Sequence, residues 1–227
     1  MNQVREVDEG KQMIESAKRV GVKLLLISSE PSITKASNGR LTKVVHFDSK
    51  AEISDYARQA GVKFVEIYAS AYMNNLTSFV KPRPAGDGTY IWDGTWSETT
   101  SLPLIDTYHD FGLFVRLAIE SEEFNPGDGK VISAYSEWVS VADQARILSE
   151  VTGKVVRYNR ITDEQLRSSL ARAGLPPHAI DDMVDMFHFH EEYWAKTYVH
   201  SNRNGLARQP RTFREYCEAE DWSTVLN

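Results

Sequence analysis

Hydrophobic and polar positions near the start of the chain follow the pattern of a βαβ unit. Two short apolar runs, residues 22–28 and 62–68, each follow a glycine that ends a helical pattern, Gly21 and Gly61. The run 22–28 is typical of a strand that is covered on both faces in a parallel sheet, and the run 62–68 predicts a second strand. Between them, residues 41–60 carry apolar side chains at helical spacing. Strand, helix and strand with short connections predict two parallel strands joined by a right-handed crossover.

The rest of the chain continues this mixed pattern. Apolar spacing predicts helices over residues 4–20, 107–120 and 140–151 and on both sides of Pro176-Pro177, and strands over residues 89–92, 131–134 and 154–158. These elements predict an α/β fold: a partial Rossmann-type parallel sheet, whose N-terminal strands are missing, with a smaller, mainly helical C-terminal lobe. We assign residues 1–80 to the C-terminal half of a Rossmann-like nucleotide-binding domain. Residues 81–227 form a substrate or partner lobe interleaved with the last strands of the sheet.

A glycine-rich phosphate turn is absent from the 227 residues. A complete dinucleotide-binding fold carries this turn in its first βαβ pair, where the pyrophosphate meets a helix N-terminus. The βαβ pattern of this chain starts too late to contain that pair, so we expect weak or absent binding of free NAD or NADP by the chain itself. We also expect residues 22–28 to form an uncovered apolar edge strand. Such an edge predicts a homodimer or another protein partner, or poor solubility.

Composition narrows the classes of function. A net charge of −6 argues against direct binding of nucleic acid, which favours basic surfaces. No apolar run approaches the roughly 18 residues needed to span a bilayer, and the N-terminal segment is too polar for a signal peptide, so we expect a cytosolic or nuclear protein. The single cysteine, Cys217, is expected to be a buried, inert thiol. The aromatic stretch 90–96 is expected to form core in the second lobe.

His46 and Lys50 are the strongest candidates for chemistry. They lie four residues apart on the predicted helix and therefore share a face. Ser28 and Ser29 end the preceding strand, and ligands of open α/β sheets bind at the carboxyl ends of strands. The plainer alternatives are that His46 and Lys50 belong to a solvated helix face, and that the serines satisfy backbone groups at the strand end.

Three segments, in their order and spacing, resemble the NmrA-like family of atypical short-chain dehydrogenases, which is related to the isoflavone reductases. They are Lys-Leu-Leu-Leu-Ile-Ser-Ser-Glu-Pro at 23–31, His-Phe-Asp-Ser-Lys-Ala-Glu-Ile at 46–53 and Ala-Tyr-Met-Asn-Asn-Leu at 71–76. Later segments, including Ala-Gly-Leu-Pro-Pro at 173–177 and Arg-Thr-Phe-Arg-Glu-Tyr at 211–216, resemble fungal members. The resemblance covers essentially the whole chain and corresponds to the later two-thirds of a full-length member.

The resemblance implies roles for individual residues and a nicotinamide cofactor, NADP or NAD. Lys50 matches the lysine that lies near the nicotinamide and is the catalytic residue of the reductase branch. His46 stands where standard dehydrogenases have a tyrosine, so the pair cannot do identical work. The remaining matches surround the cofactor: Ser28 and Ser29 at the strand end, and Tyr72 and Asn75 in the turn that closes over it.

The histidine-containing segment 188–192 is a candidate metal site, because His188 and Glu192 are four residues apart. Zinc hydrolases need His-Glu-x-x-His, and the run that begins at His190 lacks the last histidine. We therefore expect no metal site. An amphipathic helix is the better account of this segment, with a core face formed by Met183, Met186, Phe187 and Tyr193.

Three functions stay open. The leading interpretation is a redox- or nucleotide-responsive regulatory or binding protein, since the tyrosine and the glycine turn are both missing. The second is an NAD(P)-dependent reductase of an aromatic or alkenyl small molecule, with Lys50 as proton donor. The third is a redox-neutral isomerase or cyclase of secondary metabolism, in which Lys50, His46 and Tyr72 form the acid–base set.

Overall fold

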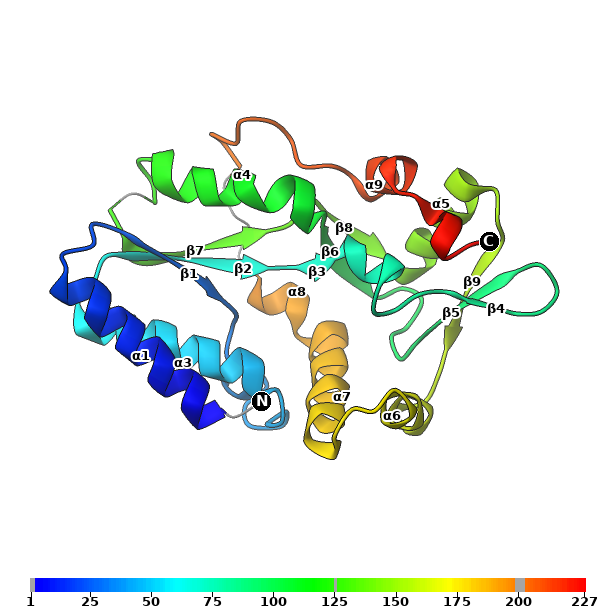
Figure 1. The fold of residues 1–227 in the computed structure, drawn as a ribbon, viewed down its shortest axis with the longest axis horizontal. Helices are drawn as coiled ribbons and strands as arrows, with labels where there is room; N and C mark the ends of the chain where they lie inside the picture. The colour runs from blue at the N-terminus through cyan, green and yellow to red at the C-terminus, as the bar shows by residue number, and fades with distance from the viewer. Residues whose placement is uncertain (1–2, 125, 199–202) are drawn as a thin grey trace. The chain divides into compact units, whose positions relative to one another are not determined.

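The computed structural model describes residues 3–124, 126–198 and 203–227 (Figure 1). The chain forms two compact units, each assembled from three segments. The first unit comprises Met1–Ala69, Gly112–Ala134 and Pro176–Arg208, and the second comprises Ser70–Phe111, Tyr135–Leu175 and Gln209–Asn227. Helices and strands alternate along the chain, which confirms the predicted α/β fold.

A parallel three-stranded sheet forms the centre of the first unit, in the order β1-β2-β7. Its strands are β1 (Leu25–Ser29), β2 (Phe64–Ala69) and β7 (Asp128–Ala134). The pairing runs from Leu25 opposite Phe64 to Ser29 opposite Tyr68, so the predicted parallel neighbours are confirmed. The predicted start of the first strand at Val22 is wrong, because the Val22 amide donates to the Ala17 carbonyl and closes the preceding helix.

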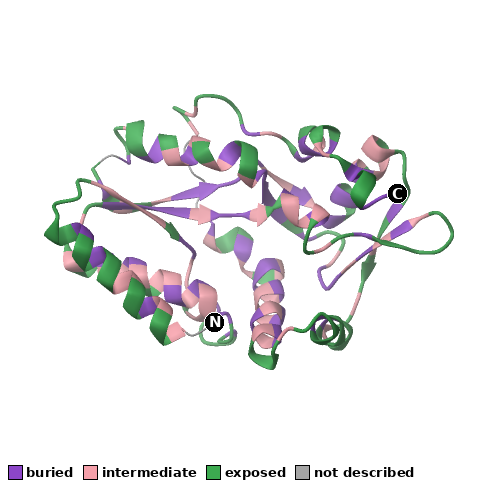
Figure 2. Ribbon diagram, in the orientation of Figure 1, coloured by how far each residue is buried: buried purple, intermediate pink, exposed green. Residues whose placement is uncertain are grey.

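Two helices, α1 (Gln3–Arg19) and α3 (Val45–Ala60), pack against each other beside this sheet. Their shared core contains buried Ile14, Ala57 and Phe64. Close approach depends on Gly10, since a Cβ atom there would lie 2.5 Å from Cδ1 of Ile53. Figure 2 shows that the outward face of α1 is exposed, as an amphipathic helix requires.

The start of α3 is fixed by another helix. The predicted start at Leu41 is wrong: the helix begins at Val45, and its N-cap residue Val44 provides no side-chain hydrogen bond. Asp182 of α7 (Pro177–Glu192) supplies the missing acceptor, since the Val45 amide donates to its Oδ2 at 3.0 Å. Asp185 of the same helix accepts from two further amides in the preceding loop.

The core face of α7 differs from the predicted one. Phe187 is buried as predicted, but Met183 and Met186 are only half-buried. The buried residues of this helix are Ile180, Asp182, Val184, Phe187, Phe189 and His190. The short helix α8 (Trp194–Thr197) follows, and α2 (Ile33–Ala36) lies between β1 and α3 in the chain.

The second unit contains two small mixed sheets. One has the order β3-β6-β8, from β3 (Ala71–Tyr72), β6 (Ser101–Ile105) and β8 (Glu137–Ser140). The other has the order β4-β5-β9, from β4 (Arg83–Pro84), β5 (Tyr90–Gly94) and β9 (Val156–Arg160). β6 and β8 are absent from the sequence prediction, because β6 contains Pro103 and β8 has only four residues. The aromatic side chains of Tyr90, Trp92 and Trp96 are buried, as predicted.

Helices of the second unit begin with the caps that their sequences indicate. Ser140 caps α5 (Val141–Thr152), and Thr162 with Gln165 forms a capping box on α6 (Asp163–Arg172). Thr212 forms a second capping box on α9 (Phe213–Ala219). The remaining elements are α4 (Thr107–Glu120) and the short 3₁₀ helices η1 (Met73–Thr77) and η2 (Trp222–Thr224).

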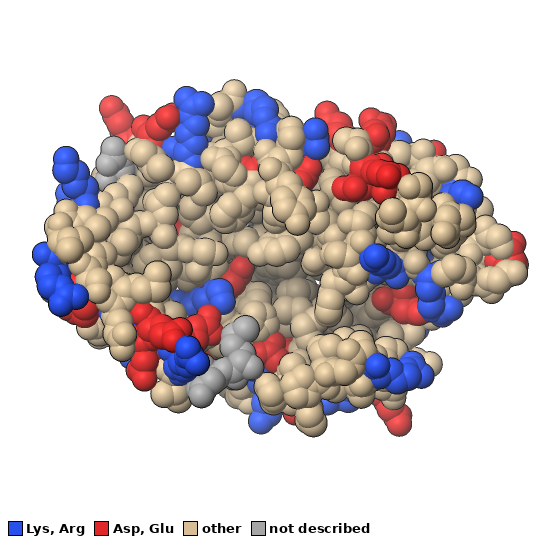
Figure 3. All heavy atoms as spheres, viewed as in Figure 1, with Lys and Arg blue, Asp and Glu red and all other residues tan. Residues whose placement is uncertain are grey.

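The cysteine thiol is buried, and the surface shown in Figure 3 carries charges of both signs. Cys217 is buried, and burial raises the pKa of its thiol to about 12, which makes it inert as predicted. Charges of both signs are interspersed over the face shown in Figure 3, among the residues drawn in colour. Within the described ranges, no helix has both the length and the apolar character that crossing a membrane requires.

Candidate functional site

Lys50 lies on α3, and a carboxylate of α1 holds its ammonium group. Lys50 Nζ is 3.1 Å from Oε1 of Glu6 and also donates to the His46 carbonyl at 3.2 Å. The hydroxyl of Ser49 donates to the other oxygen of Glu6 at 2.7 Å. Burial opposes ionisation of Glu6, but the hydrogen bonds from Ser49 and Lys50 and the charge of Lys50 lower its pKa below the ordinary value. Glu6 is therefore a firmly ionised partner of Lys50.

His46 is held in the same way by α7. Its Nδ1 lies 2.6 Å from Oδ1 of Asp182, whose other oxygen accepts the Val45 amide. Asp182 is 7% exposed, so this carboxylate has little solvent around it. A neutral imidazole that donates through Nδ1–H keeps the lone pair on Nε2, and the ring can accept a proton there. The pair His46–Asp182 is thus arranged as an oriented base.

The two serines at the end of β1 have different surroundings. Ser29 is fully buried, and its hydroxyl lies 2.9 Å from that of Ser54 and 3.5 Å from the Lys50 carbonyl. Its side chain therefore ties β1 to α3. Ser28 is exposed and is the one of the two that solvent reaches.

Glu30, the residue after β1, is a buried carboxyl that sequence reasoning missed. It is 9% exposed, and its Oε2 has no hydrogen-bond partner among the described residues. Burial raises its pKa well above the ordinary value, while the charge of Lys50 and hydrogen bonds from Tyr198 and Ala69 act in the opposite direction. The available signal was its position, an acidic residue directly after an apolar strand.

His190 is a second buried titratable group of this unit. Its ring stacks on Trp194 with centroids 3.8 Å apart, and burial lowers its pKa to about 3. His190 is therefore a neutral core residue. Glu192, weighed above as a metal ligand, pairs with Arg40. The described residues contain no group of three His, Cys, Asp or Glu side chains placed to hold a metal ion.

Tyr72 and Asn75 belong to the second unit, so their part in the site stays a prediction. Tyr72 ends β3 and is 44% exposed. Asn75 is half-buried in η1, where its backbone carbonyl accepts the amides of Ser78 and Val80. The structure thus brings together His46, Lys50 and Ser29 in the first unit and adds Glu6, Asp182 and Glu30 to them.

Comparison with known proteins gives a consistent relationship. The family model described as “NmrA-like family” matches residues 2–217. The nitrogen metabolite repression protein nmr of Neurospora crassa is 28% identical over 157 residues, which are 66% of this chain and 32% of that protein. The NmrA-like family domain-containing oxidoreductase ptmS of Penicillium ochrochloron is 26% identical over 199 residues, 82% of this chain and 57% of that protein. The chain spans less than two thirds of the length of these relatives.

Solved structures share the fold. A crystal structure of NmrA, a negative transcriptional regulator, in complex with NADP has a TM-score of 0.74 at 21% identity, covering 94% of this chain and 69% of that one. The NADPH-dependent quinone oxidoreductase QOR2 of Escherichia coli, complexed with NADPH, has a TM-score of 0.67 at 18% identity, covering 92% and 69%. Proteins of both kinds, regulators and oxidoreductases, are thus built on this fold.

Proposed function

Because the chain belongs to the NmrA-like family, we propose that it is a regulatory or binding protein that responds to nicotinamide nucleotides and binds them weakly or not at all by itself. The observation that carries this proposal is the ion pair of Lys50 with Glu6 at 3.1 Å. A reductase would need this ammonium for its substrate or cofactor. Here it is neutralised by a carboxylate of the same unit.

The other candidate cofactor residues fit a dinucleotide poorly. The hydroxyl of Ser29 is directed into the protein, toward Ser54. His46, which replaces the tyrosine of standard dehydrogenases, is bound to Asp182. No glycine-rich turn for a pyrophosphate occurs in the 227 residues. Ser28 is the strand-end residue that remains open to a ligand.

Calorimetric titration of NAD⁺, NADP⁺ and NADPH into the purified chain tests the proposal. We expect no binding heat, or dissociation constants in the millimolar range. Glu6→Gln releases Lys50, so this variant should bind the nucleotides more tightly than the wild type. The matched control is Glu9→Gln on the same helix, where the exposed Glu9 pairs with Arg5. Micromolar binding by the wild type would contradict the proposal, and identical affinities of the two variants would contradict the role given to Glu6.

A second candidate function, redox-neutral proton transfer, is favoured by the His46–Asp182 pair. His46 would take a proton from an isomerase or cyclase substrate at Nε2, and Lys50 would stabilise the negative charge that develops. This function predicts turnover without nicotinamide, which Lys50→Ala abolishes and Asp182→Asn reduces. A binding protein predicts instead that Lys50→Ala leaves partner binding intact.

A further inference from the structure

A small cavity of about 260 Å³ lies within the second unit. Ligand pockets for drug-sized molecules measure roughly 300–1,000 Å³, so this cavity suits a smaller molecule. It is formed by η1, the first turn of α4 and the helix α9. The side chains that define it are Asn74, Tyr108, His109, Arg211, Tyr216 and Glu220.

Arg211 is held in place by two buried carboxylates. Its Nη1 donates to Oδ2 of Asp106 at 3.1 Å, and its backbone amide donates to Oδ2 of Asp110 at 2.8 Å. Asp106 is 3% exposed and Asp110 is fully buried. The Nε and Nη2 groups of Arg211 donate to no described residue. These two donors form the side edge of the guanidinium, which matches the two oxygens of a carboxylate.

Asn74 adds a second donor of fixed orientation. Its Oδ1 accepts the backbone amide of Thr107 at 3.2 Å and the hydroxyl of the same residue at 2.9 Å. An amide N–H can only donate, so these bonds identify the oxygen of the Asn74 side chain and leave Nδ2 as the opposite group. Nδ2 has no acceptor among the described residues. Asn74 and Arg211 therefore offer unused donors to the same cavity.

Glu220 supplies the opposite charge. One of its oxygens accepts the Asp221 amide at 3.2 Å. Burial and the nearby charge of Glu220 raise the pKa of the Tyr216 hydroxyl, which places this carboxylate close to Tyr216. Asp106 already balances the charge of Arg211, so a simple anion would be repelled by Glu220. A ligand that also carries a cation removes this repulsion.

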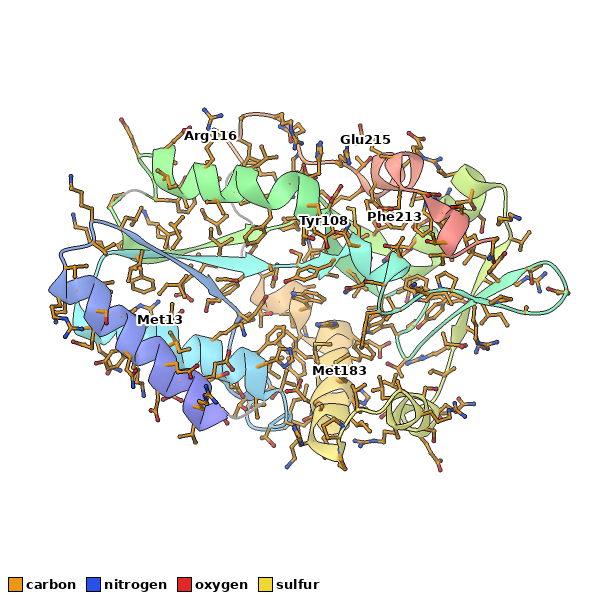
Figure 4. All side chains as sticks on the ribbon, in the orientation of Figure 1. Met13, Tyr108, Arg116, Met183, Phe213 and Glu215 are labelled. Atoms are coloured by element: carbon orange, nitrogen blue, oxygen red, sulfur yellow. The ribbon has the colours of Figure 1, made fainter. Side chains whose placement is uncertain are left out.

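An apolar surface lies at the edge of the same cavity. Tyr108 lies at the start of α4 (Figure 4). The residue is 91% exposed. Exposed aromatic side chains beside a cavity supply contact area at a low cost in side-chain entropy.

We propose that this cavity binds a free α-amino acid with an apolar or aromatic side chain. Arg211 and Asn74 hold its carboxylate, Glu220 holds its ammonium group, and its side chain covers the ring of Tyr108. The cavity lies wholly within the second unit, so this binding does not depend on Lys50 or on a nucleotide.

Titration calorimetry with L-phenylalanine and two truncated analogues tests the proposal. Phenethylamine lacks the carboxylate, and 3-phenylpropionate lacks the ammonium group. L-Phenylalanine should bind, and each analogue should bind at least about tenfold more weakly, because one charged contact is lost. Absence of binding at millimolar L-phenylalanine would overturn the proposal. Equal affinity of 3-phenylpropionate would do so as well, since the ammonium contact would then be unnecessary.

Two variants test the ligand contacts separately from the stability of the fold. Arg211→Lys keeps a positive charge beside Asp106 but removes the paired donors, and Glu220→Gln removes the negative charge. Both should weaken binding of L-phenylalanine at least about tenfold, with the thermal transition of Glu220→Gln unchanged. The matched control is Glu218→Gln, an exposed residue of the same helix that does not line the cavity. If Glu220→Gln and Glu218→Gln bind L-phenylalanine equally well, the assignment is wrong.

Discussion

Replacing Glu30 by glutamine is expected to change how the stability of the protein depends on pH. Glu30 directly follows β1 and is 9% exposed. Its Oε2 has no hydrogen-bond partner among the described residues. Glutamine has nearly the same shape and cannot ionise. The nearby Tyr198 hydroxyl can keep its hydrogen bond to the Ala69 carbonyl in the variant. The substitution therefore removes a titration with little change in packing.

The raised pKa of Glu30 determines the direction in which the stability of the protein changes with pH. The folded protein keeps a proton that the unfolded chain releases above the ordinary pKa of 4.5. The contribution to stability is fully present below about pH 4.5 and is lost as the pH rises toward the pKa of the folded state. One proton of difference changes the free energy of unfolding by about 1.4 kcal/mol per pH unit. The advantage of Glu30→Gln over the wild type should grow by this amount per unit within that window.

Urea unfolding of both proteins between about pH 4 and pH 8 measures this difference. The pH at which the two curves become parallel gives the pKa of Glu30 in the folded state. Glu218→Gln is the control, because Glu218 is exposed and should give a curve parallel to that of the wild type. Parallel curves for Glu30→Gln and the wild type over the whole range would refute the reasoning, since Glu30 would then titrate as it does in the unfolded chain.

Three further results are expected. Burial lowers the pKa of His190 to about 3, so stability should fall by about 1.4 kcal/mol per unit as the pH drops below 6.5, and His190→Phe should remove this loss in the same urea assay. Gly10→Ala should lower the free energy of unfolding by about 1 kcal/mol, because overpacking against Ile53 costs about 1–3 kcal/mol and outweighs a helix-propensity gain of about 1 kcal/mol. Gly112→Ala, where the added methyl meets no atom within 4 Å, should instead stabilise by about 0.5–1 kcal/mol, and equal effects of the two would be contrary evidence. The outer edge of β1 is expected to pair with a second copy of the chain, so light scattering should show a concentration-dependent dimer that Ser28→Lys removes, and a monomer at all concentrations would exclude this pairing.

Local sequence patterns predicted which helices and strands form better than they predicted where these helices and strands begin and end. The runs 22–28 and 62–68 and the helix between them gave the parallel pair β1 and β2, because apolar runs and helical spacing are properties of neighbouring residues. The start of α3 could not be derived in this way. Its first amide is accepted by Asp182, which lies 137 residues later in the chain. A helix end capped from another helix has no local signature.

In the candidate site, too, local sequence predicted the shared helix face but not the distant residues that fold against it. Helical spacing placed His46 and Lys50 on one face, but each is bound by a carboxylate of another helix, and Glu6 is 44 residues away from Lys50 in the sequence. Nothing in the sequence around Glu6 distinguishes it from the other acidic residues of α1. Its low pKa arises only once folding brings Ser49 and Lys50 to it.

The two carboxylates therefore give separate control over the two members of the pair. Glu6 reaches Lys50 from α1, and Asp182 reaches His46 from α7, so each can be changed without altering the pair itself. Substitution of Lys50 removes its charge and also leaves Glu6 without its partner, which mixes two effects. Glu6→Gln alters the electrostatic surroundings of Lys50, and Asp182→Asn alters the orientation of His46. If the first changes nucleotide binding and the second changes cofactor-free turnover, the lysine and the histidine serve different functions in this fold.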